Sequence, residues 1–316
     1  MRLVTADGGV LDDILDSTYP VWGEGLSREA YGKWNRAQVE TAWGRSHLRR
    51  VASIEDGRVL ASAKRYDLQA RIGDRIISVL GIGAVFTPPS GRRQGHARAL
   101  IEAMIEDAAA RGCRAALLFS EIGAAYYERL GFRVMPQRVR TIETAGRPGA
   151  PAALVRTGEE RDLPAMAEMA ARAREGASFA LDRSADHIAF FLTRKRLLAG
   201  LGPAGLRAVE FFVTEEAHRA VAYVVLTRGP HGVYLEDCGD CDPTGARVGA
   251  MLQTLAARTP AGAPLRFRAW LPAGWRTTQW RVVSDAATDE IMMVRPPGED
   301  LPIAPDQIVY PHLDVF

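Results

Sequence analysis

Two amphipathic segments divide the chain into halves with similar patterns. Between Ala97 and Ala108, apolar side chains recur at i, i+3, i+4, i+7, i+8 and i+11, which predicts a helix with one continuous apolar stripe. Residues 244–258 repeat the pattern, with Val248, Met251, Leu252 and Leu255 as the stripe. Apolar runs precede and follow both segments, as expected for buried strands. Each half is therefore expected to be a mixed α/β unit in which a strand leads into a central helix.

The two halves also begin alike. "RLVTADGGVLDDILDSTYPVW" at the start of the chain and "LVRTGEERDLPAMAEMAARA" after residue 153 both indicate a strand, a turn and a helix. The segment between them, "TAGRPGAPAAL", is rich in Gly, Pro and Ala, which is typical of a linker. We therefore expect an internal duplication, with tandem α/β domains (α+β, mixed sheet) over residues 1–145 and 151–316.

Composition and charge narrow the class of protein. The 316 residues are 47% hydrophobic and 25% charged, and 40 Lys and Arg residues face 38 Asp and Glu residues. The net charge of +2 gives no electrostatic reason to expect a nucleic-acid or membrane partner. The start of the chain has no apolar signal region, and three cysteines do not form a disulfide framework. We expect a soluble cytoplasmic protein.

The stretch "TPPSGRRQGHARAL" carries the clearest chemistry. Arg92 and Arg93 stand at the start of the predicted helix, where positive charge opposes the helix dipole. Unpaired backbone N–H groups at a helix N-terminus bind anions, and arginine adds charge and bidentate donors for phosphate oxygens. Gly95, which lacks a Cβ, allows a phosphate to approach the backbone closely. These residues predict an anion site that fits a nucleotide or a coenzyme.

Other binding motifs fail on spacing. No GxxxxGK[ST] sequence occurs, and the glycines of "GIGAVF" lie inside an apolar strand, so neither a P-loop nor a dinucleotide fingerprint is expected. Cys238 and Cys241 form a CxxC, but a zinc site needs two more ligands, and His218 and His231 lack ligand spacing. No metal site is expected.

Two segments resemble the GNAT superfamily of N-acetyltransferases. "RRQGHA", Arg92 to Ala97, is similar to the R/Q-x-x-G-x-G/A signature of that family and lies between an apolar strand and a long helix, as it does there. "AAYYERLGF" follows about 30 residues later and resembles the family's A..fYeklGF segment. The resemblance covers residues 1–145 well and the rest only as a similar order of elements. "GAVFTPPSGRRQGHARAL" and "SEIGAAYYERLGF" are similar to Eis-type acetyltransferases, although this chain is too short for their third domain.

The resemblance implies direct acetyl transfer from acetyl-CoA to an amine, without an acyl-enzyme. The strand before the loop offers backbone groups to the pantetheine arm and the thioester carbonyl, and the loop and helix start hold the pyrophosphate. The residues at these positions are Val85, Phe86, Thr87, Arg92, Arg93, Gln94, Gly95, His96 and Ala97. Tyr127 stands where many members keep the tyrosine that protonates the leaving thiolate, and Tyr126 is its rival.

The resemblance also suggests a base and acceptor residues. Eis-type enzymes use a C-terminal carboxylate as the base, which makes the carboxylate of Phe316 a candidate. Trp22, Glu24 and Glu121 are candidates for contacts with a small-molecule or peptide amine.

The second half is expected to be degenerate. Gly245 aligns with Gly95, but Asp242 then replaces Arg92 and would repel a pyrophosphate. Its expected role is to cover the acceptor cleft or to hold a homo-oligomer. The alternative for the whole chain is a coenzyme-binding module without transfer activity, acting as a sensor or an interaction subunit.

Overall fold

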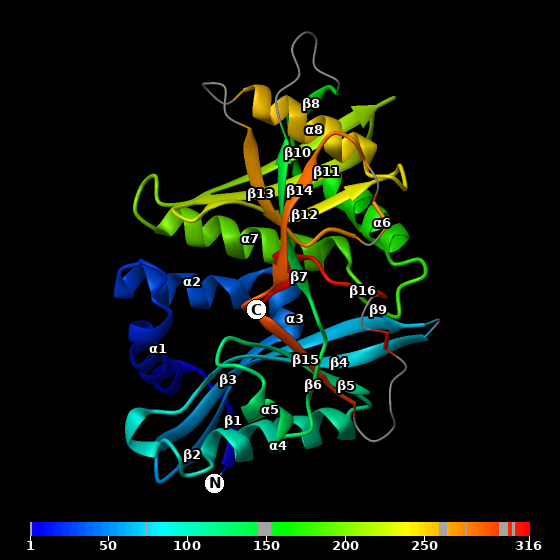
Figure 1. Ribbon diagram of the computed structural model, residues 1–316. Coiled ribbons are helices and arrows are strands. Elements are labelled where there is room, and N and C mark those ends of the chain that lie inside the picture. Colours follow the sequence, from blue (N-terminus) through cyan, green and yellow to red (C-terminus); the bar gives the residue numbers. More distant parts are fainter. Residues whose placement is uncertain are drawn as a thin grey trace.

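Two β-sheets, each covered by helices, form the two layers of the molecule (Figure 1). The computed structural model describes residues 2–73, 75–144, 153–258, 264–272, 274–275, 277–296, 303–304 and 307–316. The expected mixed α/β class is confirmed. Most of the expected linker, residues 145–152, lies outside the described residues.

The N-terminal sheet has the path β1-β2-β3-β4-β5-β15-β6. Along this path only β4 and β5 pair in parallel, because α4 (His96–Ala110) connects them as a crossover. A short strand of the second half, β9, extends this sheet by pairing with β3 and β16. The strands are β1 (Arg2–Thr5), β2 (Leu48–Glu55), β3 (Arg58–Ile72), β4 (Arg75–Phe86), β5 (Ala115–Ser120), β6 (Arg133–Val134), β9 (Phe179–Leu181), β15 (Ile291–Arg295) and β16 (Ile308–Val309).

Helices cover both faces of this sheet. The predicted stripe of α4 is buried at Leu100, Ile101, Met104 and Ala108, so this helix packs on one face. Ser27 accepts a hydrogen bond from the Ala30 N–H at 3.2 Å and caps the second helix. The other helices of this half are α1 (Gly8–Trp22), α2 (Arg28–Glu40), α3 (Ala42–His47) and α5 (Ala125–Glu128).

The second sheet has the order β14-β7-β13-β12-β11-β10-β8. Its strands are β7 (Arg138–Thr144), β8 (Val155–Thr157), β10 (Ala208–Glu216), β11 (Arg219–Gly229), β12 (Gly232–Asp240), β13 (Leu265–Ala269) and β14 (Arg281–Ala287). Its helices are α6 (Leu163–Ala173), α7 (Ala185–Leu201) and α8 (Ala246–Ala257). As in the first sheet, the strand before the central helix, β12, pairs in parallel with the strand after it, β13.

The two sheets exchange strands, as Figure 1 shows for β7 and β15. Strand β7 belongs to the first half of the sequence but pairs with β13 and β14 in the second sheet. Strand β15, near the end of the chain, lies between β5 and β6 in the N-terminal sheet. Each half of the sequence therefore completes the sheet of the other half.

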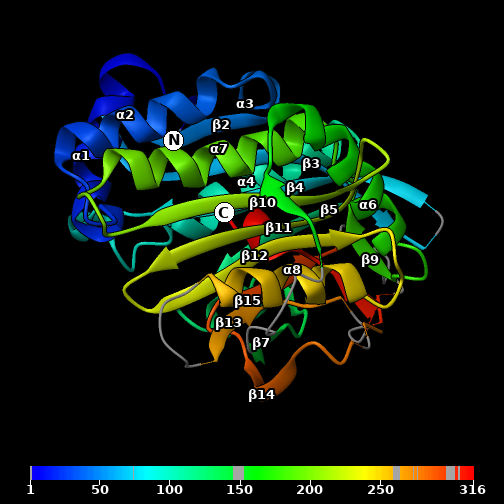
Figure 2. The same cartoon turned by 90° about the horizontal axis from the view of Figure 1, so that it is seen from above.

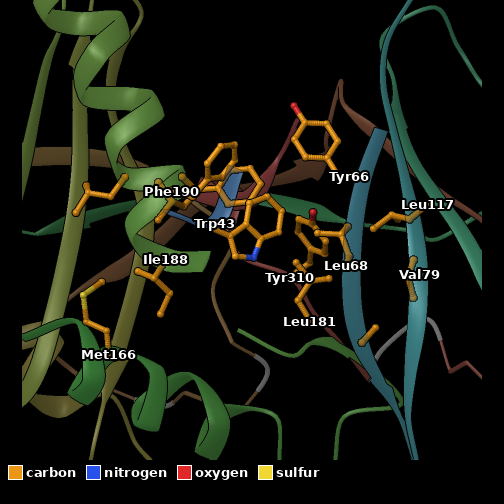
Figure 3. Packing of buried hydrophobic residues seen from close by; sticks show 14 of the residues in the cluster. Trp43, Tyr66, Leu68, Val79, Leu117, Met166, Leu181, Ile188, Phe190 and Tyr310 are labelled. Atoms are coloured by element: carbon orange, nitrogen blue, oxygen red, sulfur yellow. The ribbon is translucent and has the colours of Figure 1, made fainter. Parts of the chain in front are cut away.

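The layers are joined by a shared apolar core. Helices α2 and α7 lie side by side in both views (Figures 1 and 2), and the Trp34 indole donates a hydrogen bond to the Arg194 carbonyl at 3.0 Å. The rings of Trp43 and Phe190 lie 4.7 Å apart where α7 faces strand β3, which carries Tyr66 and Leu68 (Figure 3). This continuous core fixes the second half against one face of the N-terminal sheet.

Candidate functional site

Strand β4 separates from β5 at its C-terminal end. The parallel register runs as far as Ile82 opposite Leu118, whereas β4 continues to Phe86. The pairing of β4 with β3 also shifts here, between Gly83 and Phe86, and Ala84 has a φ of 46°. The bulge twists the end of β4, and beyond Ile82 the strand no longer pairs with β5. We refer to this separation of the two strands as the gap.

The loop after this gap presents an open helix N-terminus. Gly95, the N-cap of α4, has a φ of 85°, a left-handed conformation that glycine adopts without strain. Among the described residues, no side chain caps α4. The first N–H groups of this 15-residue helix are therefore free to bind an anion.

The side chains of the loop are exposed and ready for a ligand. Arg92 and Arg93 have no carboxylate within 4.0 Å in the part of the chain that the structure describes. Arg92 donates only a long hydrogen bond, 3.4 Å, to the Thr87 carbonyl. Gln94 donates to the Ser90 carbonyl at 3.1 Å and lies 3.3 Å from His96. Two unpaired guanidinium groups beside a free helix N-terminus make a strongly anion-attracting surface.

The equivalent helix start in the second half is already occupied by a carboxylate. Gly245, the N-cap of α8, has a φ of 73° and so matches Gly95. Asp240 accepts hydrogen bonds there from the N–H groups of Arg247 at 2.8 Å and Val248 at 3.1 Å. The carboxylate at this position is therefore Asp240; the expected one, Asp242, instead accepts from Thr244 N–H at 2.8 Å.

A ring also closes the second site. A Cβ on Gly245 would lie 2.5 Å from the indole of Trp275. The space that a glycine leaves beside the backbone is therefore filled by the Trp275 ring. The second helix start is therefore filled by the protein's own side chains.

Tyr127 lies on the face of the N-terminal sheet that α4 covers. It packs with Leu100, Leu118 and Phe132 in that core and is 8% exposed. Burial, with a smaller contribution from Tyr126, raises the pKa of Tyr127 to about 12. Its hydroxyl forms no hydrogen bond with any described residue. Burial also raises the pKa of the half-buried Tyr126.

Phe316 lies on the opposite face of the same sheet. Its ring packs 4.4 Å from Tyr66 and 5.5 Å from Phe119. A Cβ on Gly83 would lie 3.3 Å from the main-chain carbon and oxygen of Phe316, so this main-chain group rests on β4 where the gap begins. No hydrogen bond joins Phe316 to Tyr127, two residues that the structure describes fully.

The predicted acceptor residues lie near the gap but differ in availability. Trp22 packs 6.1 Å from Phe86, at the end of β4. Glu24 forms an ion pair with Arg207 at 2.7 Å and is therefore already engaged. Glu121 has no ion-pair partner among the described residues; burial raises its pKa, and the charges of Glu290 and Glu24 add to the effect. The carboxylates of Glu121, Glu290 and Glu24 therefore lie close enough to interact electrostatically.

A polar cluster in the second half, which the sequence did not predict, continues the row of carboxylates from Glu121 through Glu290. His312 lies 2.6 Å from Glu236 and 3.0 Å from Glu290, and the three side chains line a cavity of about 300 Å³. Burial lowers the pKa of His312, but the charge and hydrogen bond of Glu236 outweigh it and raise the pKa overall. No local pattern marks these residues, because 22 or more positions separate His312 from its partners.

The remaining candidates are placed as follows. Cys238 and Cys241 are free thiols, as is Cys113. In the described ranges, no cluster of three His, Cys, Asp or Glu side chains is arranged to hold a metal ion. The helices described here are all too short or too polar to cross a bilayer.

Comparisons with known proteins identify the N-terminal domain. Residues 14–135 match the family model described as "Acetyltransferase (GNAT) domain". No curated protein matches the sequence. Among solved structures, a GCN5-related N-acetyltransferase from Kribbella flavida is similar over 93% of this chain and 71% of its own, with a TM-score of 0.69 and 19% identity.

Two further structures share this arrangement. A probable N-acyltransferase from Enterococcus faecalis is similar over 93% of this chain and 72% of its own, with a TM-score of 0.69 and 13% identity. Eis1 from Mycobacterium abscessus is similar over 94% and 74%, with a TM-score of 0.59 and 14% identity. These likenesses extend over both halves and show a shared fold. Residues 14–135 are therefore an acetyltransferase (GNAT) domain, and the likeness in fold continues through the second half of the chain.

Proposed function

We propose that the N-terminal domain transfers an acetyl group directly from acetyl-CoA to an amine. The observation that carries this proposal is the contrast between the two helix starts. The start of α4 has two unpaired arginines and no capping side chain, whereas Asp240 fills the start of α8. Of these two equivalent helix starts, only that of α4 is open to an anion such as the pyrophosphate of a coenzyme.

The coenzyme would lie along the gap. Its pyrophosphate binds Arg92, Arg93 and the backbone N–H groups that follow Gly95, with Gln94, His96 and Ala97 around it. The pantetheine arm runs beside Val85, Phe86 and Thr87 at the end of β4. A backbone N–H of this bulged segment, directed at the thioester carbonyl, would stabilise the developing oxyanion by about 3 kcal/mol.

Acid and base would act from opposite faces of the sheet. The amine nitrogen attacks the thioester carbonyl, the carboxylate of Phe316 accepts the proton that the nitrogen loses, and the C–S bond breaks. Tyr127 gives a proton to the departing thiolate on the α4 face, and its raised pKa keeps it protonated for that role. Tyr126 remains the rival acid because it stands beside Tyr127.

The acceptor would approach from the face that carries Phe316. Trp22 supplies an aromatic wall there, and Glu121 is the carboxylate best placed to attract a cationic amine, since Glu24 is held by Arg207. The second half packs on this side of the sheet, which supports a role as the cover of the acceptor cleft.

Calorimetric titration with acetyl-CoA, followed by a thiol-release assay over a panel of amines, tests the proposal. We expect binding and amine-dependent release of coenzyme A. Binding without release from any amine would favour the alternative, a coenzyme-binding sensor or interaction module, and absence of binding would overturn both.

A further inference from the structure

The segment Tyr310–Phe316 is held by a buried ion cluster. Asp314 is fully buried, and Arg183, 4% exposed, contacts both of its carboxylate oxygens, with Nε 2.7 Å from Oδ2 and Nη2 donating to Oδ1 at 3.0 Å. The same Nη2 donates to Asp237 of β12 at 2.7 Å. His187 of α7 completes the cluster, with Nε2 3.0 Å from Asp314. Every group that contacts the Asp314 carboxylate therefore comes from the second half.

The pKa values of the two buried carboxyl groups in this cluster shift in opposite directions. Burial favours the neutral form of Asp314, but Arg183 and His187 outweigh it and lower its pKa. Burial raises the pKa of Asp237, which Arg183 only partly opposes. Arg183 therefore pairs with both carboxylates at once, and through Asp314 it holds the segment Tyr310–Phe316 against β12. A buried carboxylate without this partner would be costly, so the contact strongly restrains where the segment lies.

Two hydrogen bonds to backbone carbonyls hold the same segment at Asp314 and at Val315. The Tyr310 hydroxyl donates to the Asp314 carbonyl at 2.8 Å. Arg194 of α7 donates to the Val315 carbonyl at 2.6 Å. The next residue, Phe316, leaves the second half and rests against Gly83 and Tyr66 of the N-terminal sheet. The segment is therefore anchored in one half and delivers its last residue to the other.

We propose that Arg183 and Asp314 are positioning residues of the transfer site, which hold Phe316 in the gap between β4 and β5. The second half, whose own helix start is closed, thereby contributes an essential part of the N-terminal site. The effect on turnover rests on the proposed function, whereas the anchoring itself does not. Two separate readouts therefore test the two parts.

Hydrogen–deuterium exchange of residues 307–316 in the full-length protein measures the anchoring. Asp314→Asn keeps the shape of the side chain and removes its charge, and we expect exchange in this segment to become about tenfold faster or more. Tyr310→Phe is a milder variant that leaves the ion pair intact and serves if Asp314→Asn does not fold. Asp285→Asn is the matched control, because Asp285 also pairs with two arginines, Arg138 and Arg140, but on the exposed edge strand β14. Unchanged exchange in the segment of a folded variant would overturn the proposal.

Thiol release by the same variants measures the consequence. We expect kcat to fall about tenfold to a hundredfold in Asp314→Asn, with a smaller change in the KM for acetyl-CoA. Added formate, a small carboxylate, should restore part of the turnover, which a merely structural defect would not allow. Faster exchange with normal turnover would confirm the anchor and remove Phe316 from the proposed reaction. Lost turnover with unchanged exchange would overturn the positioning role.

Discussion

The Asp240 carboxylate accepts a hydrogen bond from the backbone N–H of Arg247 at 2.8 Å and so occupies the N-terminus of α8. The equivalent helix of the N-terminal domain, α4, has no such carboxylate at its start. The two helices begin at left-handed glycines and follow equivalent strands, and yet only one of them lacks an internal anion. This difference separates a helix start that is free to bind a ligand from one that is closed by the protein.

Replacing Arg92 and Arg93 by alanine should weaken acetyl-CoA binding by about 1.5–3 kcal/mol for each charged hydrogen bond lost. Neither side chain has an ion-pair partner among the described residues, so the folded protein loses little else. Calorimetry on the double variant measures the loss. Arg247→Ala, at the equivalent helix of the second half, is the control and should leave the affinity unchanged. Wild-type affinity in the Arg92 and Arg93 variant would contradict the pyrophosphate site.

Acetyl-CoA should bind with a stoichiometry of one per chain. A second coenzyme at α8 would have to displace both Asp240 and the ring of Trp275 from the helix start. Calorimetric titration of the wild-type protein gives this number directly. A stoichiometry of two would show that the second half is not degenerate.

The loop before α4 and the helix itself could be predicted from the sequence because the patterns that mark them are local. The stripe from Leu100 to Ala108, the turn at Gly95 and its counterpart at Gly245 each depend on residues within a few positions of one another. Such patterns fix which face of a helix is buried and where the helix begins. The mixed α/β class followed from the same patterns.

The sequence could not predict the exchange of β7 and β15 between the sheets or the anchoring of Asp314. Apolar alternation identifies a strand but not its partner, and β15 pairs with a strand more than 150 positions earlier in the sequence. Arg183 and Asp314 carry ordinary charged side chains whose burial depends on packing between the halves. Likewise, spacing aligns Asp242 with Arg92 but does not show that Asp240 turns back over the helix start.

Tyr127→Phe should lower kcat by about a hundredfold and change acetyl-CoA affinity little, because a general acid acts on the leaving group and not on coenzyme binding. In the wild-type protein the pKa of about 12 keeps this acid protonated, so kcat should show no decline from its ionisation until the pH approaches that value. Steady-state thiol release across pH measures both effects. Tyr126→Phe is the comparison: a larger loss in that variant would transfer the acid role to Tyr126.

Gly83→Ala should reduce turnover by displacing Phe316. The new Cβ would lie 3.1 Å from the ring and 3.3 Å from the main-chain carbon and oxygen of Phe316, so that residue must move. A displacement of this kind costs about tenfold to a hundredfold in rate when the moved group is the base. Gly9→Ala is the control, since a Cβ there has no heavy atom within 4 Å. Full activity in a Gly83→Ala variant that melts at the wild-type temperature would argue against Phe316 as the base.

His312→Gln should destabilise the protein in a pH-dependent way. Because folding raises the pKa of His312 above its ordinary value of 6.5, its pairing with Glu236 and Glu290 stabilises the protein fully below that value and is lost as the pH rises through the folded pKa. We expect a loss of about 1.5–3 kcal/mol in the free energy of unfolding at the acidic end, shrinking toward alkaline pH. Glu236 keeps Lys195 as a partner at 3.0 Å, so the variant should still fold. Denaturant unfolding at several pH values measures this difference. His218→Gln, at a side chain that is 99% exposed, is the control, and a loss of stability in His312→Gln that is constant with pH would contradict the assignment.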